Sequence, residues 1–257
     1  MIPCGSYPPI LSVGAKLLIK TPLVLSQFCA RCGGTDSNMS ELEDYIATVR
    51  ARETQTWGFA IYRTAYGATT DVPWQSLLEA IRTNVRTEVL GLRAPRGGNP
   101  PHFSDEETQR CEEFLSLLKL DVKEDQSILE SVSMDRVREM IKETDPRPTD
   151  DEPMAGTLTT LQGVFLYVDD EVLEAAQTPT GSRPPWVKVV ELDYKPEQHK
   201  GNRRVGPQSY FGWMKLSTGS FFQLWQDLEG QDLWKLAPRN SDERLLTIWD
   251  GVLNNQM

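Results

Sequence analysis

The chain has 257 residues, of which 39% are hydrophobic and 25% are charged, and this balance excludes a fibrous or wholly disordered protein. Its formal net charge of −10 disfavours nucleic acid and anionic membrane surfaces as partners, because both carry negative charge. The four cysteines lack the regular spacing of a disulfide framework, so we expect reduced thiols and a cytoplasmic protein.

Residues 1–38 are expected to form a disordered extension, because they are rich in Pro, Gly, Ser and Cys and show no sustained period. A single α+β domain is then expected over residues 39–257. Within the extension, Cys29 and Cys32 have the spacing of half a zinc knuckle, but structural zinc needs four ligands and no second such pair follows. We predict that these thiols are incidental, with zinc binding and a redox dithiol as alternatives, and that the protein has no cofactor.

The ordered part is expected to open with a helix at Ser40, which together with Glu43 resembles a capping box. The next segment, residues 57–66, is rich in aromatic and β-branched side chains and predicts a strand. Beyond it, apolar residues recur at helical spacing from Trp74 to Val85, which predicts an amphipathic helix.

Acidic residues are concentrated between residues 105 and 152, where 16 acidic and 7 basic side chains give a net charge of −9. Short apolar groups at residues 114–118 and 137–141 predict two short helices, and the three prolines of residues 145–153 predict an exposed linker. We interpret residues 104–153 as an acidic helical insertion. A solvated insertion is favoured over a segment that binds a partner.

Three further strands are predicted in the second half of the chain, at residues 164–168, 186–192 and 211–216. The first is apolar on both faces and is therefore expected to be central. Residues 245–249 are compatible with a fifth strand, and residues 221–228 predict a helix. This order favours an α+β fold with a mostly antiparallel sheet of four or five strands and helices on one face. The favoured topology is ferredoxin-like.

Three blocks of this sequence carry a family resemblance. The segments WGFAIYRTAYG (residues 57–67), FLYVDDEVL (residues 165–173) and FGWMK (residues 211–215) resemble, in order and spacing, a large set of uncharacterised proteins from filamentous ascomycete fungi. The likeness runs from about residue 56 to residue 250 in separated blocks. It implies a fungal source and a shared fold, but no activity, substrate or catalytic residue.

Asp169, Asp170 and Glu171 form the first candidate site, because they follow a predicted buried strand and open a helix. Carboxylates at the end of a strand can hold Mg²⁺ or act as acid and base. The alternative, which we favour, is that one of them caps the helix while the others complement the helix dipole.

Two other pairs of residues are candidates for ligand binding. Arg63 could bind a carboxylate or phosphate through its planar guanidinium, with Tyr66 closing one side of the site. The alternative is that Arg63 pairs with an acidic neighbour at the edge of a sheet. Trp213 and Lys215 share one face of a predicted strand and form the second pair.

The chain lacks the motifs of dinucleotide-binding proteins, P-loop nucleotidases, zinc proteases and serine hydrolases, and it has only two histidines. We therefore expect a non-catalytic, soluble binding or interaction protein, whose partner is an unknown protein or small molecule. A small-molecule enzyme or ligand-binding protein, for instance of secondary metabolism, is the first alternative, and a secreted effector is the second. A deep apolar pocket with converging polar groups would favour the first alternative.

Overall fold

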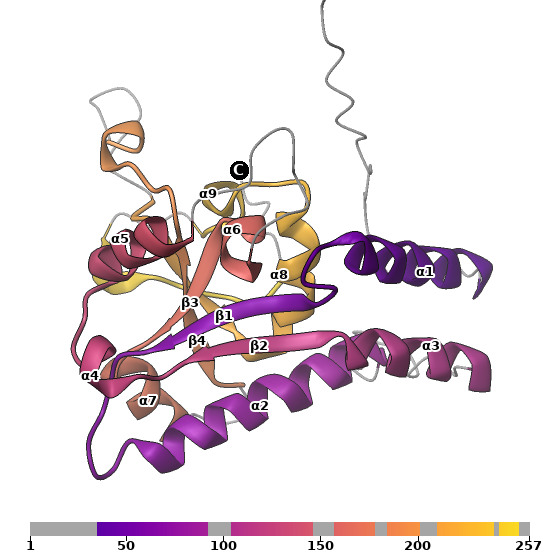
Figure 1. Ribbon diagram of the computed structural model, residues 1–257, viewed down its shortest axis with the longest axis horizontal. Helices are drawn as coiled ribbons and strands as arrows, with labels where there is room; N and C mark the ends of the chain where they lie inside the picture. Colours follow the sequence, from indigo (N-terminus) through magenta and orange to yellow (C-terminus); the bar gives the residue numbers. More distant parts are fainter. Residues whose placement is uncertain are drawn as a thin grey trace, which may run out of the picture.

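The domain is built around one mixed sheet with helices on both of its faces (Figure 1). The computed structural model describes residues 35–91, 104–145, 157–177, 184–200, 210–238 and 242–251. The predicted α+β class is confirmed. In these ranges the strands follow one another across the sheet in the order β2-β1-β3-β4-β5-β6. Their bounds are β1 Trp57–Arg63, β2 Leu118–Lys123, β3 Val164–Val168, β4 Trp186–Glu191, β5 Trp213–Ser217 and β6 Ile248–Trp249.

The helices connect these strands and pack against the sheet. The α-helices are α1 Thr35–Ala51, α2 Asp71–Val89, α3 Asp105–Ser116, α4 Gln126–Leu129, α5 Met134–Thr144, α6 Leu158–Gln162, α7 Asp170–Gln177, α8 Phe221–Leu228 and α9 Leu233–Leu236. The 3-10 helices are η1 Pro196–Gln198, η2 Thr218–Ser220 and η3 Glu243–Leu245. No helix in the described ranges combines the length and the apolar composition needed to cross a membrane.

The start of the ordered part differs from the prediction. Helix α1 begins at Thr35, inside the predicted extension of residues 1–38 and ahead of the predicted start at Ser40. Residues 1–34 lie outside the described residues, and with them Cys29 and Cys32.

The sheet is mixed, and the prediction of a mostly antiparallel sheet with four or five strands was wrong. Strand β1 pairs in parallel with β2 and with β3, and β5 pairs in parallel with β6. The β3–β4 and β4–β5 pairings are antiparallel. A ferredoxin-like topology is not confirmed. The physical reason is that long helical segments separate β1, β2 and β3, so the chain can return to the same end of the sheet before each new strand.

Residues 104–145, the described part of the predicted acidic insertion (residues 104–153), contribute to the sheet and to the core. They supply strand β2, which pairs with β1 over six residue pairs. The helix predicted at residues 114–118 is only the end of α3, and the strand that follows it was missed. Apolar and charged residues alternate along β2 with the period of a strand, but the charge of the segment obscured this pattern. Of the predicted linker, residues 146–153 lie outside the described residues.

One face of the sheet carries most of the buried hydrophobic side chains, because alternate residues of β1, β3, β4 and β5 point towards it. Helices α1, α2, α3, α7 and α8 contribute the opposing side chains. We call this the main core. Its largest fully buried members include Trp57, Phe59, Trp74, Ile81, Phe114, Phe221 and Trp225.

The other face carries a second core under α5. It consists of Val137, Ile141, Phe165, Tyr167, Val190, Leu192 and Trp213. Arg138 of α5 fixes the helix to the sheet, since Nε donates to the carbonyl of Glu191 at 2.8 Å and Nη2 donates to that of Gly212 at 2.9 Å. The expectation that all helices lie on one face was therefore wrong. Strand β3 is apolar on both sides because both of its faces are covered.

Candidate functional site

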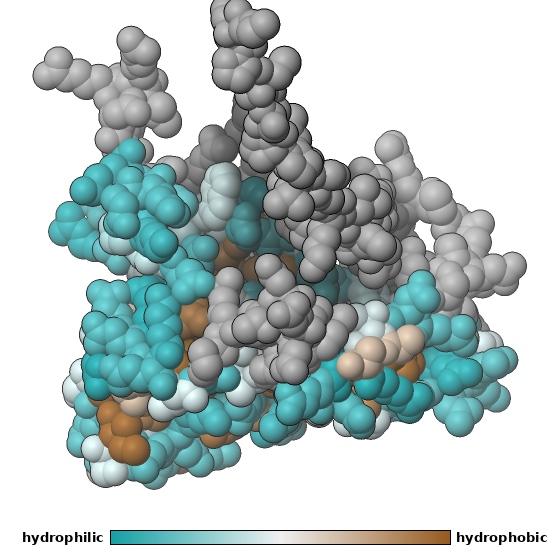
Figure 2. Space-filling view, turned by 45° about the horizontal axis from the view of Figure 1, so that its top comes forward, coloured by the Kyte–Doolittle hydropathy of each residue, from teal (hydrophilic) through white to brown (hydrophobic). Residues whose placement is uncertain are grey.

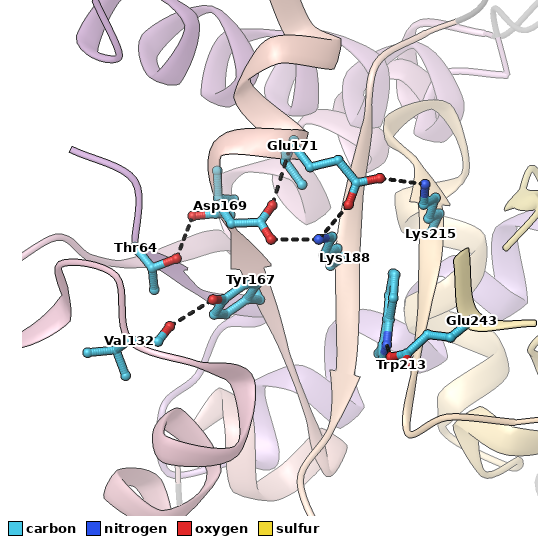
Figure 3. A network of polar contacts seen from close by, with 11 residues as sticks. Thr64, Val132, Tyr167, Asp169, Glu171, Lys188, Trp213, Lys215 and Glu243 are labelled. Carbon is cyan, nitrogen blue, oxygen red and sulfur yellow. Dashed lines mark hydrogen bonds and ion pairs between the residues drawn. The ribbon is translucent and has the colours of Figure 1, made fainter. Parts of the chain in front are cut away.

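Four of the residues selected from the sequence meet on the sheet face that carries the second core, and one of them, Trp213, is itself a member of that core (Figure 3). Asp169, Glu171, Trp213 and Lys215 surround Lys188 of β4. A cleft of about 330 Å³ opens beside them, lined by Glu171, Trp213, Lys215, Glu243 and Arg244. We call these five residues, together with Lys188 and Asp169, the lysine cleft.

The strand register places the two lysines next to each other. Lys188 is paired with Tyr167 of β3 on one side and with Lys215 of β5 on the other, so all three side chains point to the same face. Lys188 is only 5% exposed. Like charges directly opposite in neighbouring strands destabilise a sheet, so this pair of lysines requires a negative partner.

Glu171 supplies that partner from the first turn of α7. Its Oε2 atom lies 2.7 Å from Nζ of Lys188, and its Oε1 atom lies 2.7 Å from Nζ of Lys215. Asp169 adds a second carboxylate to Lys188, with Oδ2 at 2.6 Å from Nζ. Each carboxylate oxygen of Glu171 therefore accepts from a different strand, which ties α7 to β4 and β5.

Asp169 also caps helix α7. Its Oδ1 atom accepts a hydrogen bond from the backbone N–H of Val172 at 3.3 Å, as expected for a carboxylate at a helix start. Asp170 is exposed in the first turn of the helix, where its charge complements the helix dipole. Of the three adjacent carboxylates, Asp169 and Glu171 thus belong to the lysine cleft, while Asp170, which stands between them in the sequence, contacts none of its residues through a described ion pair.

Two tryptophan rings complete the surroundings of the lysines. Nζ of Lys188 lies 5.1 Å from the ring centre of Trp213, and Nζ of Lys215 lies 4.3 Å from that of Trp186. Both distances are in the range of cation–π attraction. The indole N–H of Trp213 donates to Oε1 of Glu243 at 2.7 Å, which attaches η3 to the sheet.

The electrostatics of the lysine cleft keep its central charges fixed. Burial raises the pKa of Glu171, but hydrogen bonds from Lys188 and Lys215 outweigh burial and leave this pKa below its ordinary value. Burial lowers the pKa of Lys188, but its bonds to Asp169 and Glu171 outweigh burial and leave this pKa raised. Both shifts move the pKa of the group further from neutral pH. The arrangement therefore offers permanent charges for recognition and holds no proton poised for transfer at these two groups.

Arg63 and Tyr66 do not belong to the lysine cleft. The guanidinium of Arg63 donates from Nε to the carbonyl of Ala65 at 3.0 Å and from Nη2 to Oγ1 of Thr70 at 2.9 Å. It also pairs with Asp71, and its Cζ atom lies 4.8 Å from the ring centre of Tyr66. N–H donors of Arg63 are therefore engaged by its own loop and by the start of α2. Pairing with an acidic neighbour agrees with the alternative considered above, but the expected place at the edge of a sheet was wrong, because β1 lies between β2 and β3.

Sequence reasoning missed Lys188, Glu243 and Arg244. A signal for Lys188 existed, because a lysine between valines in an otherwise apolar strand needs a buried partner. No local pattern marked the other two residues, which reach the site only through the pairing of the C-terminal strand. In the described ranges no group of three or more His, Cys, Asp or Glu side chains could hold a metal ion.

Outside the lysine cleft, Asp227 of α8 has a strongly shifted pKa. It is half-buried, its Oδ2 atom has no hydrogen-bond partner in the described part of the chain, and desolvation raises its pKa to about 6. Since the folded state binds this proton more tightly than the unfolded state, stability falls as the pH rises from 3.8 to about 6. We expect Asp227→Asn to raise the melting temperature at pH 7 and to change it little at pH 4.

Thermal unfolding at the two pH values measures this effect. Asp44→Asn is the matched control, because Asp44 is exposed on α1 and its removal should leave the pH dependence unchanged. A lower melting temperature for Asp227→Asn at pH 7 would show that the carboxylate is stabilising.

The lysine cleft combines two sheet lysines, carboxylates from α7 and η3, and the ring of Trp213. Its residues come from four separate segments of the chain, so the site depends on the fold and not on a short motif. Comparisons with protein-family models, with curated proteins and with solved structures gave no significant match to this chain.

Proposed function

We propose that this chain is a non-catalytic binding protein whose lysine cleft takes a carboxylate group of its ligand. The observation that carries the proposal is that two cations with unused hydrogen-bond donors, Lys215 and Arg244, line one cleft beside an aromatic ring. A carboxylate can accept from both, and charge-assisted hydrogen bonds of this kind are the strong ones.

The unused donors follow from the contacts of each cation. Lys215 has three N–H donors, and one of them bonds to Glu171 at 2.7 Å. Arg244 bonds to Asp242 through Nε at 3.3 Å and Nη2 at 3.1 Å, while its side chain stays 88% exposed. Five N–H donors are available to a guanidinium, so several remain for a ligand.

Charge balance narrows the class of ligand. The lining contains two cations, Lys215 and Arg244, and two carboxylates, Glu171 and Glu243. A dianion such as phosphate would meet repulsion from both carboxylates, whereas a carboxylate beside a neutral or positive group finds a partner for each charge. The proposal therefore favours a peptide segment or a small molecule that carries a carboxylate next to an amine or amide.

The size and polarity of the cleft support recognition of a small group. Its volume of about 330 Å³ lies at the lower end of the roughly 300–1,000 Å³ usual for ligand sites. On the face drawn in Figure 2 the coloured residues are mostly hydrophilic, and the hydrophobic areas among them are small and separate. The alternative of a small-molecule enzyme receives less support, because the pKa shifts of Glu171 and Lys188 lead away from neutral pH.

We also propose a cytoplasmic location and membership of the fungal family. The location is supported by Cys111, a buried free thiol in the described residues. Family membership rests on the three sequence blocks. Two of them meet at the lysine cleft, since residues 165–173 supply Asp169 and Glu171 and residues 211–215 supply Trp213 and Lys215.

A library of N-acetylated tripeptides with free carboxyl termini, and the same library with C-terminal amides, tests the proposed ligand chemistry. We expect binding from the free acids, measured by tryptophan fluorescence, and about 10-fold or greater weakening on amidation, because a charged hydrogen bond contributes about 1.5–3 kcal/mol. Lys215→Gln should remove the difference between acid and amide.

The matched control is Lys235→Gln, because Lys235 of α9 also pairs with a carboxylate, that of Asp232, but lies outside the cleft lining. It should leave affinity unchanged. Equal affinity of acids and amides, or an unaltered preference in Lys215→Gln, would contradict the proposed ligand.

A further inference from the structure

Strand β2 forms an open edge of the sheet. It pairs with β1, and among the described residues no other strand lies beside it. None of its six residues is buried, whereas six of the seven residues of β1 are. An edge strand presents unpaired backbone N–H and C=O groups, which form a template for another strand.

The pairing with β1 determines which backbone groups face outwards. The N–H of Trp57 donates to the carbonyl of Leu117 at 3.0 Å, while Trp57 stands opposite Leu118 in the register. In a parallel ladder this means that the odd-numbered residues of β2 bond to β1. The even-numbered residues Leu118, Leu120 and Val122 therefore direct their N–H and C=O groups to the open edge.

The side chains of β2 have a self-complementary charge order. Lys119, Asp121 and Lys123 alternate with apolar residues, so all three point to the face opposite the main core. When a second copy of β2 runs antiparallel with Leu120 opposite Leu120, each Lys119 faces Asp121 of the other copy. A register centred on Asp121 would instead place Lys119 opposite Lys123. Opposite charges favour the first register, and like charges disfavour the second.

The same register satisfies the backbone. With Leu120 at the centre, Leu120 exchanges both of its hydrogen bonds with its counterpart, and Leu118 exchanges its bonds with Val122 of the other copy. These are the residues whose groups face outwards. Lys119 and Asp121 then form a non-hydrogen-bonded pair, in which side chains approach more closely.

We propose that two copies of this chain associate through β2, antiparallel and centred on Leu120, so that the two sheets become continuous. Such a contact is isologous, because each copy uses the same strand. Within a single copy Asp121 pairs with Lys123 at 3.1 Å, while Lys119 has no ion pair with any described residue. The second copy supplies the missing partner of Lys119.

Sedimentation velocity of the full chain over a concentration series tests this association. The wild-type chain is expected to form a dimer. Lys119→Asp and Asp121→Lys each place like charges opposite one another at two symmetric positions, so each should weaken the dimer by about 10-fold or more. The double variant Lys119→Asp, Asp121→Lys restores opposite charges and should recover most of the wild-type affinity.

A matched control is Lys195→Asp, the same charge change at an exposed residue outside β2, which should leave the dimer unchanged. Thermal unfolding of each variant verifies that it is folded. A wild-type chain that stays monomeric at its highest attainable concentration overturns the proposal. Single variants that dimerise as the wild type does, or a double variant that fails to recover the dimer, also overturn it.

Discussion

Replacing Trp57 with alanine is expected to lower the free energy of unfolding by about 3–5 kcal/mol, the usual cost of removing a large buried aromatic side chain. Trp57 is fully buried in the main core. Its ring stacks on Phe114 with 4.5 Å between ring centres and also contacts Phe222 and Trp225. Its indole N–H donates to the carbonyl of Phe114 at 2.8 Å, so the substitution removes a hydrogen bond together with the packing.

Urea denaturation of the variant and the wild-type chain measures this loss. Trp234→Ala is the control, because Trp234 is 44% exposed on α9 and its loss should change the free energy of unfolding by at most about 1 kcal/mol. Equal losses for the two variants would show that the aromatic cluster around Trp57 does not dominate the main core.

Lys188→Met is expected to lower the free energy of unfolding by about 3 kcal/mol, near the lower end of the cost of breaking a buried ion pair. The variant leaves the carboxylates of Asp169 and Glu171 without their shared ammonium. Both carboxylates are partly exposed, with side-chain exposures of 28% and 50%, so water offsets part of the loss. A similar loss is not expected from Lys142→Met, whose ammonium is 48% exposed and pairs with Asp193 at 3.3 Å.

The pH dependence provides an internal test of this second prediction. The pKa of Glu171 is lowered in the folded state, so its stabilising contribution is present above its unfolded pKa and disappears as the pH falls through the folded pKa. The difference between Lys188→Met and the wild-type chain should therefore shrink in acid. Adding Asp169→Asn and Glu171→Gln to the variant should recover most of the stability at pH 7, because the unpaired charges are then gone. An unchanged deficit in this triple variant would show that packing of the lysine stem, and not its charge, stabilises the site.

Strands, helices and caps that depend on neighbouring residues in the chain could be predicted from the sequence. Strand β1 and helix α2 follow from the aromatic run at residues 57–63 and from the helical spacing of Trp74 to Val85. The apolar run of β3 correctly indicated a central strand, because both of its faces are covered. A cap of α7 by one of the three adjacent carboxylates was likewise expected, and the structure shows that it is Asp169.

The sheet topology and the assembly of the lysine cleft depend on pairing between distant segments and could not be predicted from the sequence. Side chains alternate with a period of two residues in both parallel and antiparallel strands, so this period does not show in which direction two strands pair. The parallel pairings of β1 were therefore missed. For the same reason the sequence could select Asp169, Glu171, Trp213 and Lys215 as separate candidates but could not show that they meet. Their meeting depends on the registers of β3, β4 and β5, which also place Lys188 at the centre.

The position of β1 inside the sheet also has a consequence for synthesis of the chain. Its two neighbours are β2 and β3, whose first residues, Leu118 and Val164, follow Trp57 by 61 and 107 positions. At roughly 5–20 residues per second, a ribosome needs about 3–12 seconds after Trp57 before β2 begins, and about 5–21 seconds before β3 begins. During that time the edges of β1, six of whose seven residues are buried in the fold, have no native partner strand. The rate of translation through residues 64–168 therefore sets how long β1 stays without its two partner strands, and unpaired strand edges of this kind favour aggregation.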